Sequence, residues 1–191
     1  MSADASPNPH ARMTGIVYLL YFLTAIPAQL LASRKLVLYS DIVNLIAFAF
    51  YVGMTLLFYY LFRPVNRSLS GLAAFLSLAG CAIGVLGLFH LAPSHISPLW
   101  FFGPYCLLIG YLILRSTFLP RLLGVLMVLA GIAWLAFLSP PVEKHFSVYI
   151  EALGILAEAS LMLWLIVMGV NVPHWNEQAG VVIDVRPRST E

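Results

Sequence analysis

The chain has 191 residues, of which 61% are hydrophobic and only 9% are charged, and its formal net charge is +2. A soluble domain carries roughly 25% charged residues, so this composition excludes an ordinary water-soluble protein. The basic residues are spread among short connections rather than gathered in a patch, which argues against a nucleic-acid partner. Membrane lipids are the partners that the composition predicts.

Six apolar runs follow one another along the chain, each bounded by Arg, Lys, Pro or Asn. About 20 residues cross a bilayer core as a helix, and only a helix satisfies its own backbone hydrogen bonds in hydrocarbon. We therefore expect an all-α polytopic integral membrane protein, a bundle of six transmembrane helices in one domain, residues 13–170. The helices are predicted at residues 13–32, 36–62, 69–92, 99–114, 122–138 and 146–170.

The two ends of the chain are polar and contain proline. We expect residues 1–12 to be a disordered segment and residues 171–191 to be a polar C-terminal tail. The first apolar run is longer than a secretory signal and has no convincing cleavage site, so it is predicted to remain as a span. Gly103 and Pro104 predict an irregular start for the fourth helix.

The distribution of basic residues predicts the orientation, because cytoplasmic loops carry an excess of Lys and Arg. With the N-terminus inside, three basic residues lie outside: Arg34, Lys35 and Lys144. The inside would then hold Arg12, Arg63, Arg67, Arg115, Arg121, Arg186 and Arg188. Both termini are therefore predicted to be cytoplasmic.

Glu158 is the most informative residue, because it lies in the middle of the last apolar run. A carboxyl at that depth has almost no water to solvate it, so it is neutral, paired or facing a polar cavity inside the bundle. Glu151 is seven residues earlier and therefore on the same helix face. These two acids predict a functional site on the sixth helix.

Other polar side chains are expected at the same, outer end of the bundle. In the second helix Asp41, Asn44, Phe48, Tyr51 and Thr55 recur at intervals of three and four, which predicts one stripe facing the bundle. The hypothesis is an outward-open cavity with Glu158 at its floor, lined further by Gln29, Asp41, Asn44, His90, Tyr105 and Glu151. A simpler interpretation stays open for Asp41, Glu151 and His90, which could only reach the headgroup region or anchor their helices.

No cofactor and no metal site is predicted. The chain lacks HExxH, Glu-x-x-His and any pair of histidines on one helix, and Cys81 and Cys106 are expected to be small apolar residues of the bundle. Gly80, Gly84 and Gly87 share one face of the third helix, with a GxxxG spacing that lets another helix approach closely. An internal contact and a homo-oligomer seam are both compatible with that face.

Three stretches resemble a bacterial family of membrane proteins catalogued as domain of unknown function 4386. They are residues 61–67, residues 110–124, and residues 158–165 with Gly169, and the resemblance extends over most of residues 11–171. The chain departs from the family pattern at Pro104. The resemblance implies a six-helix protein of the bacterial cytoplasmic membrane and brings no established activity.

Two classes of function remain open. The first is a binding or transport element for a small ligand or ion, in which Glu158 is protonated as the ligand enters the outer cavity. The second is an intramembrane enzyme acting on a lipid or lipid-linked substrate, with Glu158 as general acid or base, and a structural membrane subunit is a third possibility. Because the sequence shows no convincing nucleophile, metal motif or phosphate-binding loop near the acids, we favour binding or transport over an enzyme.

Overall fold

The computed structural model describes residues 7–92 and 96–180, and within these ranges the regular structure is helical. The prediction of an all-α protein is therefore confirmed. The described residues form seven helices: α1 (Pro7–Ser33), α2 (Val37–Phe62), α3 (Arg67–Leu88), α4 (Leu99–Arg115), α5 (Arg121–Ala136), α6 (Pro140–Val167) and α7 (Val172–Gln178).

Four of these helices, α1, α2, α3 and α6, are long and apolar enough to cross a membrane. The other two apolar helices are shorter, with 17 residues in α4 and 16 in α5. At 1.5 Å per residue they extend about 24 to 26 Å, against a hydrocarbon core of about 30 Å. The structure thus has the helices of a membrane protein, and six spans remain a prediction.

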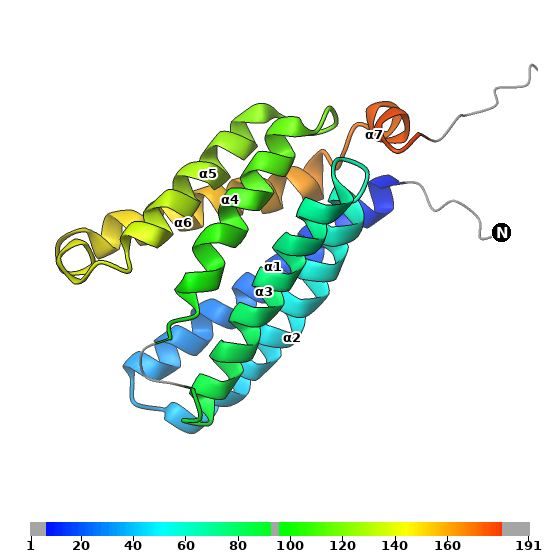
Figure 1. Cartoon of the computed structure of the whole chain (residues 1–191). Helices are drawn as coiled ribbons and strands as arrows, with labels where there is room; N and C mark the ends of the chain where they lie inside the picture. The colour runs from blue at the N-terminus through cyan, green and yellow to red at the C-terminus, as the bar shows by residue number, and fades with distance from the viewer. Residues whose placement is uncertain (1–6, 93–95, 181–191) are drawn as a thin grey trace, which may run out of the picture.

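The first six helices form a closed ring. Each packs on the next one along the chain, and α6 returns to pack on α1, with α1–α2 and α4–α5 as the most extensive pairs. Figure 1 shows α1, α2 and α3 running side by side, while α5 and α6 lean away from them. The two halves of the bundle therefore diverge toward the end that carries the α1–α2 and α5–α6 turns.

At the opposite end the ring is tied together by hydrogen bonds from the segment that contains α7. The indole Nε1 of Trp175 donates to the carbonyl of Leu61 at 3.1 Å, and Nε2 of Gln178 donates to the carbonyl of Arg115 at 3.2 Å. The backbone N–H of Asn171 donates to the carbonyl of Phe118. These bonds satisfy carbonyls at helix ends and in a turn, groups that lack intrahelical partners.

Both chain ends differ from the sequence prediction over the described residues. Helix α1 begins at Pro7 rather than at residue 13, and α7 lies inside the predicted polar tail. Proline is compatible with a first helical turn, where its missing N–H has no intrahelical partner. Asn171 caps α7 by accepting from the N–H of His174, a short-range signal that hydropathy does not register. Residues 1–6 and 181–191 lie outside the described ranges.

The start of the fourth helix also differs from the prediction. Helix α4 is continuous from Leu99, and Pro104 lies inside it. A proline near the beginning of a helix removes one backbone hydrogen bond without forcing the helix to end. Helix α6 begins at Pro140, six residues before the predicted boundary, because Pro140 and Pro141 occupy its first turn.

Glycines bring α4 and α5 into backbone contact. A Cβ added to Gly110 would lie 2.8 Å from the amide nitrogen of Val128 and 2.9 Å from the carbonyl oxygen of Gly124. A Cβ on Gly131 would lie 2.8 Å from the amide nitrogen of Leu107. The closest small-residue packing is therefore at this antiparallel pair rather than on α3.

The glycines predicted for packing on α3 have different surroundings. Gly80 faces the start of α4, where a Cβ would lie 3.3 Å from the Cβ of Phe101, and Gly84 faces the ring of Phe48 on α2. Gly87 has nothing within 4 Å of an added Cβ. Two of the three glycines thus contact helices of the same chain, and Gly87 does not.

Replacing Gly110 with alanine is expected to destabilise the bundle by about 1 to 3 kcal/mol, because the new methyl group meets backbone atoms that cannot rotate away. Gly87→Ala is the matched control, since it adds the same methyl group into open space and improves helix propensity. Thermal unfolding in detergent checks this pair. Equal midpoints for both variants would contradict the close α4–α5 contact.

Candidate functional site

A cavity of about 630 Å³ lies inside the ring of helices, and all six of them contribute to its wall. Its lining includes the last turns of α1 around Gln29, the beginning of α4 at Leu99, and the end of α5 at Trp134. It therefore occupies the half of the bundle away from α7. Most of the wall is apolar, and seven aromatic side chains line it: Tyr21, Phe22, Phe48, Tyr51, Phe102, Trp134 and Phe137.

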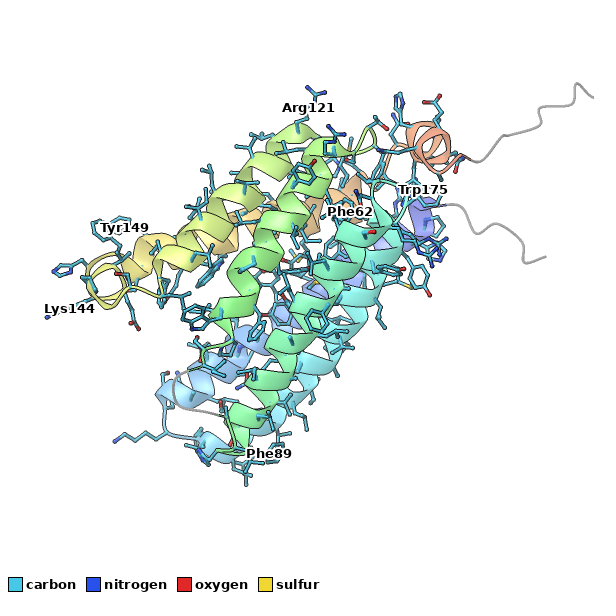
Figure 2. All side chains as sticks on the ribbon, viewed as in Figure 1. Phe62, Phe89, Arg121, Lys144, Tyr149 and Trp175 are labelled. Carbon is cyan, nitrogen blue, oxygen red and sulfur yellow. The ribbon has the colours of Figure 1, made fainter. Side chains whose placement is uncertain are left out.

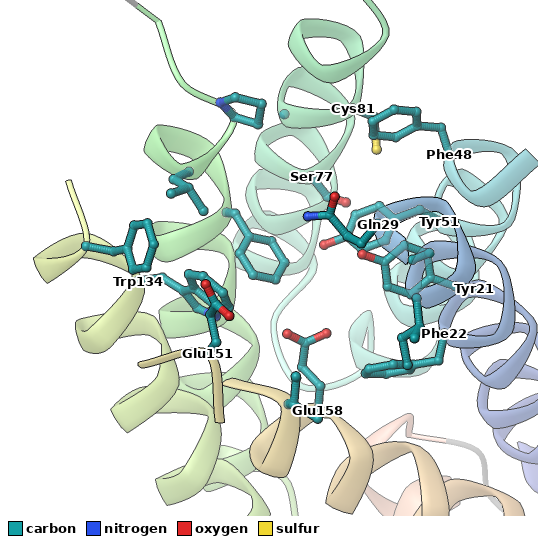
Figure 3. A pocket seen from close by; sticks show the side chains of 18 of the residues that line it. Tyr21, Phe22, Gln29, Phe48, Tyr51, Ser77, Cys81, Trp134, Glu151 and Glu158 are labelled. Carbon is teal, nitrogen blue, oxygen red and sulfur yellow. The ribbon is translucent and has the colours of Figure 1, made fainter. Parts of the chain in front are cut away.

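Glu158 lies at the deep side of this cavity. Its side chain is only 6% exposed, and its Oε2 accepts a hydrogen bond of 2.6 Å from the hydroxyl of Tyr18. Figure 3 shows its carboxyl group pointing from α6 into the cavity. The hydrogen bond joins α6 to α1 and holds one carboxyl oxygen, so the group is fixed in position while it still faces the open space.

Two further polar atoms of the wall are buried without a hydrogen-bond partner among the described residues. They are the hydroxyl of Tyr51 and the indole Nε1 of Trp134. Buried polar groups in proteins are normally hydrogen-bonded, and an unpaired one costs free energy. Both side chains line the cavity, but Nε1 of Trp134 lies against Gly154 of α6 and not in the open space.

The aromatic side chains form two groups that touch along the cavity wall, since the rings of Tyr51 and Phe102 are 6.4 Å apart between centroids. On the α1–α2 side the rings of Tyr21 and Tyr51 are 4.9 Å apart between centroids, and on the α4–α5 side Phe102 and Trp134 are 5.5 Å apart. Tyr105 lies behind both groups, 6.3 Å from Tyr51 and 6.1 Å from Phe102. Aromatic contacts of this kind hold the two sides of the wall in place.

Three of the seven side chains predicted for the cavity line it: Gln29, Glu151 and Glu158. Glu151 is exposed, two turns before buried Glu158 on the same face of α6, and Figure 3 places it near the ring of Trp134. One exposed and one buried glutamate of α6 thus line the same cavity.

The structure does not bring the other four to the cavity wall. Asn44 donates through Nδ2 to the hydroxyl of Ser40, and Asp41 is half-buried one turn earlier on α2. His90 is exposed just beyond α3 with a positive φ of 57°, and Tyr105 is buried behind the lining rings. Counting residues along a helix does not give the direction in which each helix face points.

Sequence reasoning did not identify Tyr18, the hydrogen-bond partner of Glu158. A signal was present, because Tyr18, Phe22 and Gln29 are spaced by four and seven and therefore share one face of α1. The second-helix stripe was more informative, since Phe48 and Tyr51 do line the cavity. Thr55, one turn deeper, is buried and hydrogen-bonded to Ser77 of α3.

The residues that the structure describes offer few groups for metal binding, thiol chemistry or phosphate binding at this cavity. There, no group of three or more His, Cys, Asp or Glu side chains is placed to hold a metal ion. Cys81 and Cys106 are both buried free thiols. Arg115 and Arg121 are not among the residues of the cavity wall.

Two stretches of the chain, residues 32–97 and 94–169, match the family described as Domain of unknown function (DUF4386). An uncharacterized protein of Archaeoglobus fulgidus is 26% identical over 148 residues, which cover 73% of this chain and 89% of that protein. No solved structure matches the chain. The family match covers α2 to α6 and so includes both acids of the cavity.

Substitutions at Glu158 are expected to show how much the hydrogen bond to Tyr18 contributes to the stability of the fold. Glu158→Gln keeps a carbonyl acceptor for Tyr18 and should preserve the fold, whereas Glu158→Ala leaves the buried Tyr18 hydroxyl unpaired and should cost about 1 to 3 kcal/mol. Thermal unfolding in detergent, with Glu177→Ala on exposed α7 as the control, measures the difference. Equal losses for the Gln and Ala variants would show that the hydrogen bond does not support the fold.

Proposed function

This chain belongs to the DUF4386 family, and we propose that it is a multi-pass membrane protein that binds or transports a small ligand or ion in the cavity around Glu158. One observation carries the proposal: a buried carboxyl group, fixed by Tyr18, faces a cavity of about 630 Å³. Ionisable groups inside membrane bundles are costly and typically mark ligand or ion pathways. A carboxyl with only a structural role would not need an open space beside it.

We propose six spans for this protein. Helices α4 and α5 are part of the same closed ring as the four long apolar helices. Both are apolar, and their lengths of about 24 to 26 Å fall only slightly short of the hydrocarbon core. A short span is accommodated by local thinning of the bilayer at modest cost.

We further propose that both termini lie on the cytoplasmic side of the cytoplasmic membrane. The α2–α3 and α4–α5 turns, which carry Arg63, Arg67, Arg115 and Arg121, lie at the same end of the bundle as α7 (Figure 1). Figure 2 shows Arg121 and Trp175 at this end and Lys144 far from it. The excess of basic residues favours this end for the cytoplasm, so the cavity would be on the outer side.

Exchange of a proton at Glu158 is the chemistry that this arrangement supports. The titratable groups that face this carboxyl from neighbouring helices are Tyr18, Tyr21, Tyr51, Tyr105 and Cys106. Tyrosine and cysteine are neutral or negative and never positive. Among residues 7–92 and 96–180 these groups supply no cation to neutralise Glu158, and that role falls to a proton or to a ligand.

The placement of the arginines favours binding over an enzyme that acts on phospholipids. A phosphate headgroup is best held by Arg or Lys. Arg115, whose carbonyl accepts from Gln178 of α7, and Arg121 lie at the end with α7, whereas the cavity lies in the other half. A single site would have to join groups from both ends of the bundle. We therefore place the lipid-enzyme and structural-subunit alternatives second.

The test is thermal stability of the detergent-purified protein from about pH 4 to about pH 9, a range that spans carboxyl and histidine titration. Wild type, Glu158→Gln and the exposed control Glu177→Gln are compared with a panel of divalent cations, organic ions and lipids. A ligand at 100 times its Kd stabilises by about 2.7 kcal/mol. We expect such a shift in wild type and in the control but not in Glu158→Gln.

Identical pH and ligand profiles for wild type and Glu158→Gln would overturn the proposed function. Glu158 would then be a structural acid, satisfied by Tyr18 alone.

A further inference from the structure

We infer that the ligand of this cavity is a lipophilic organic cation, whose charge is held between the carboxyl of Glu158 and the surrounding aromatic rings. The inference rests on the proposed function, because it names the chemical class that the same site would bind. It is carried by three properties of the wall: its charge, its aromatic surface and its size.

The ionisable acidic and basic side chains described in the wall are all acidic. Two carboxyl groups, Glu151 and Glu158, border the cavity, and no Lys, Arg or His is among its lining residues that the structure describes. An anionic ligand would meet like charge in a setting with little water to screen it. A cation instead meets an opposite charge at two levels, first at exposed Glu151 and then at buried Glu158.

The aromatic surface favours a cation that carries apolar substituents. Rings from four helices line the space, and Tyr21, Tyr51, Phe102 and Trp134 follow one another in ring contact along its wall. The faces of aromatic rings attract cations, most strongly where water is excluded, and they also bury apolar substituents. The unpaired Tyr51 hydroxyl adds an oxygen that can face the positive charge.

The size of the cavity excludes a bare metal ion as its main occupant. A volume of about 630 Å³ is in the range of sites that enclose drug-sized organic molecules. A bare divalent ion needs several oxygen or nitrogen ligands close together, and no group of three metal-binding acidic, His or Cys side chains is found among the described residues. An organic cation fills the space and needs only one or two acids.

Binding of such a cation is coupled to loss of a proton. When the site is empty, a protonated Glu158 carboxyl is neutral. When the cation enters, the O–H bond breaks, the proton leaves to water, and the resulting carboxylate pairs with the cation, so the net charge of the cavity stays constant. One site that exchanges a proton for a cation in this way binds the cation more tightly as the pH rises.

Two ions of matched shape and opposite sign test the inference: tetraphenylphosphonium and tetraphenylborate. Each is titrated by calorimetry into the full-length protein in detergent, with protein-free micelles subtracted. We expect tetraphenylphosphonium to bind wild type with affinity that rises with pH, and tetraphenylborate not to bind. Glu158→Gln should weaken the cation by at least about tenfold and remove the pH dependence, while Glu177→Gln should bind like wild type.

The outcomes distinguish this inference from the proposed function. Equal binding of both ions, or cation binding that Glu158→Gln leaves unchanged, overturns the cation assignment. If neither ion binds but another compound of the thermal panel stabilises the protein through Glu158, the proposed function stands and the cation assignment fails. If no compound acts through Glu158, both fail.

Discussion

The hydrogen bond between the hydroxyl of Tyr18 and the carboxyl of Glu158 is the interaction on which the arrangement of this protein depends. It joins the first helix of the ring to the last, so it secures the one pair, α1–α6, whose members are far apart in the chain. It also gives a buried acid a partner that carries no positive charge. The ring is thereby closed without neutralising the group that faces the cavity.

The two ends of the bundle satisfy their polar groups in different ways. At the α7 end, side chains such as Trp175 and Gln178 donate to carbonyls of α2 and α4. In the half that contains the cavity, called here the hollow half, the Tyr51 hydroxyl and the Trp134 indole have no hydrogen-bond partner among the described residues. Stability is therefore concentrated at one end, and unused hydrogen-bonding capacity at the other. This division is typical of proteins that keep a site apart from the contacts that hold the fold.

The sequence predicts the helices well because hydropathy is a strong signal for lipid-exposed segments. Four of the six apolar runs begin within two residues of the start of an observed helix, as at Leu99 and Arg121, and the other two begin six residues after it. The position of Glu158 and Glu151 on one face of α6 also follows from residue counting. Short polar signals at the ends, such as the Asn171 cap and the prolines of α1 and α6, are invisible to hydropathy and account for the shifted boundaries.

The sequence could not predict how each helix is rotated about its axis, and therefore which of its faces points into the bundle. In a membrane the lipid is as apolar as the interior, so apolar periodicity does not tell which face is inside. His90 and Asp41 are not among the residues of the cavity wall, and Tyr18 was not identified for the same reason. The glycines illustrate a further consequence. Backbone contact at Gly110 and Gly124 makes α4–α5 a rigid pair, and Gly15 brings α1 equally close to the backbone of Ile166 on α6. Any widening of the hollow half is therefore borne by the side-chain contacts at α3–α4 and α5–α6.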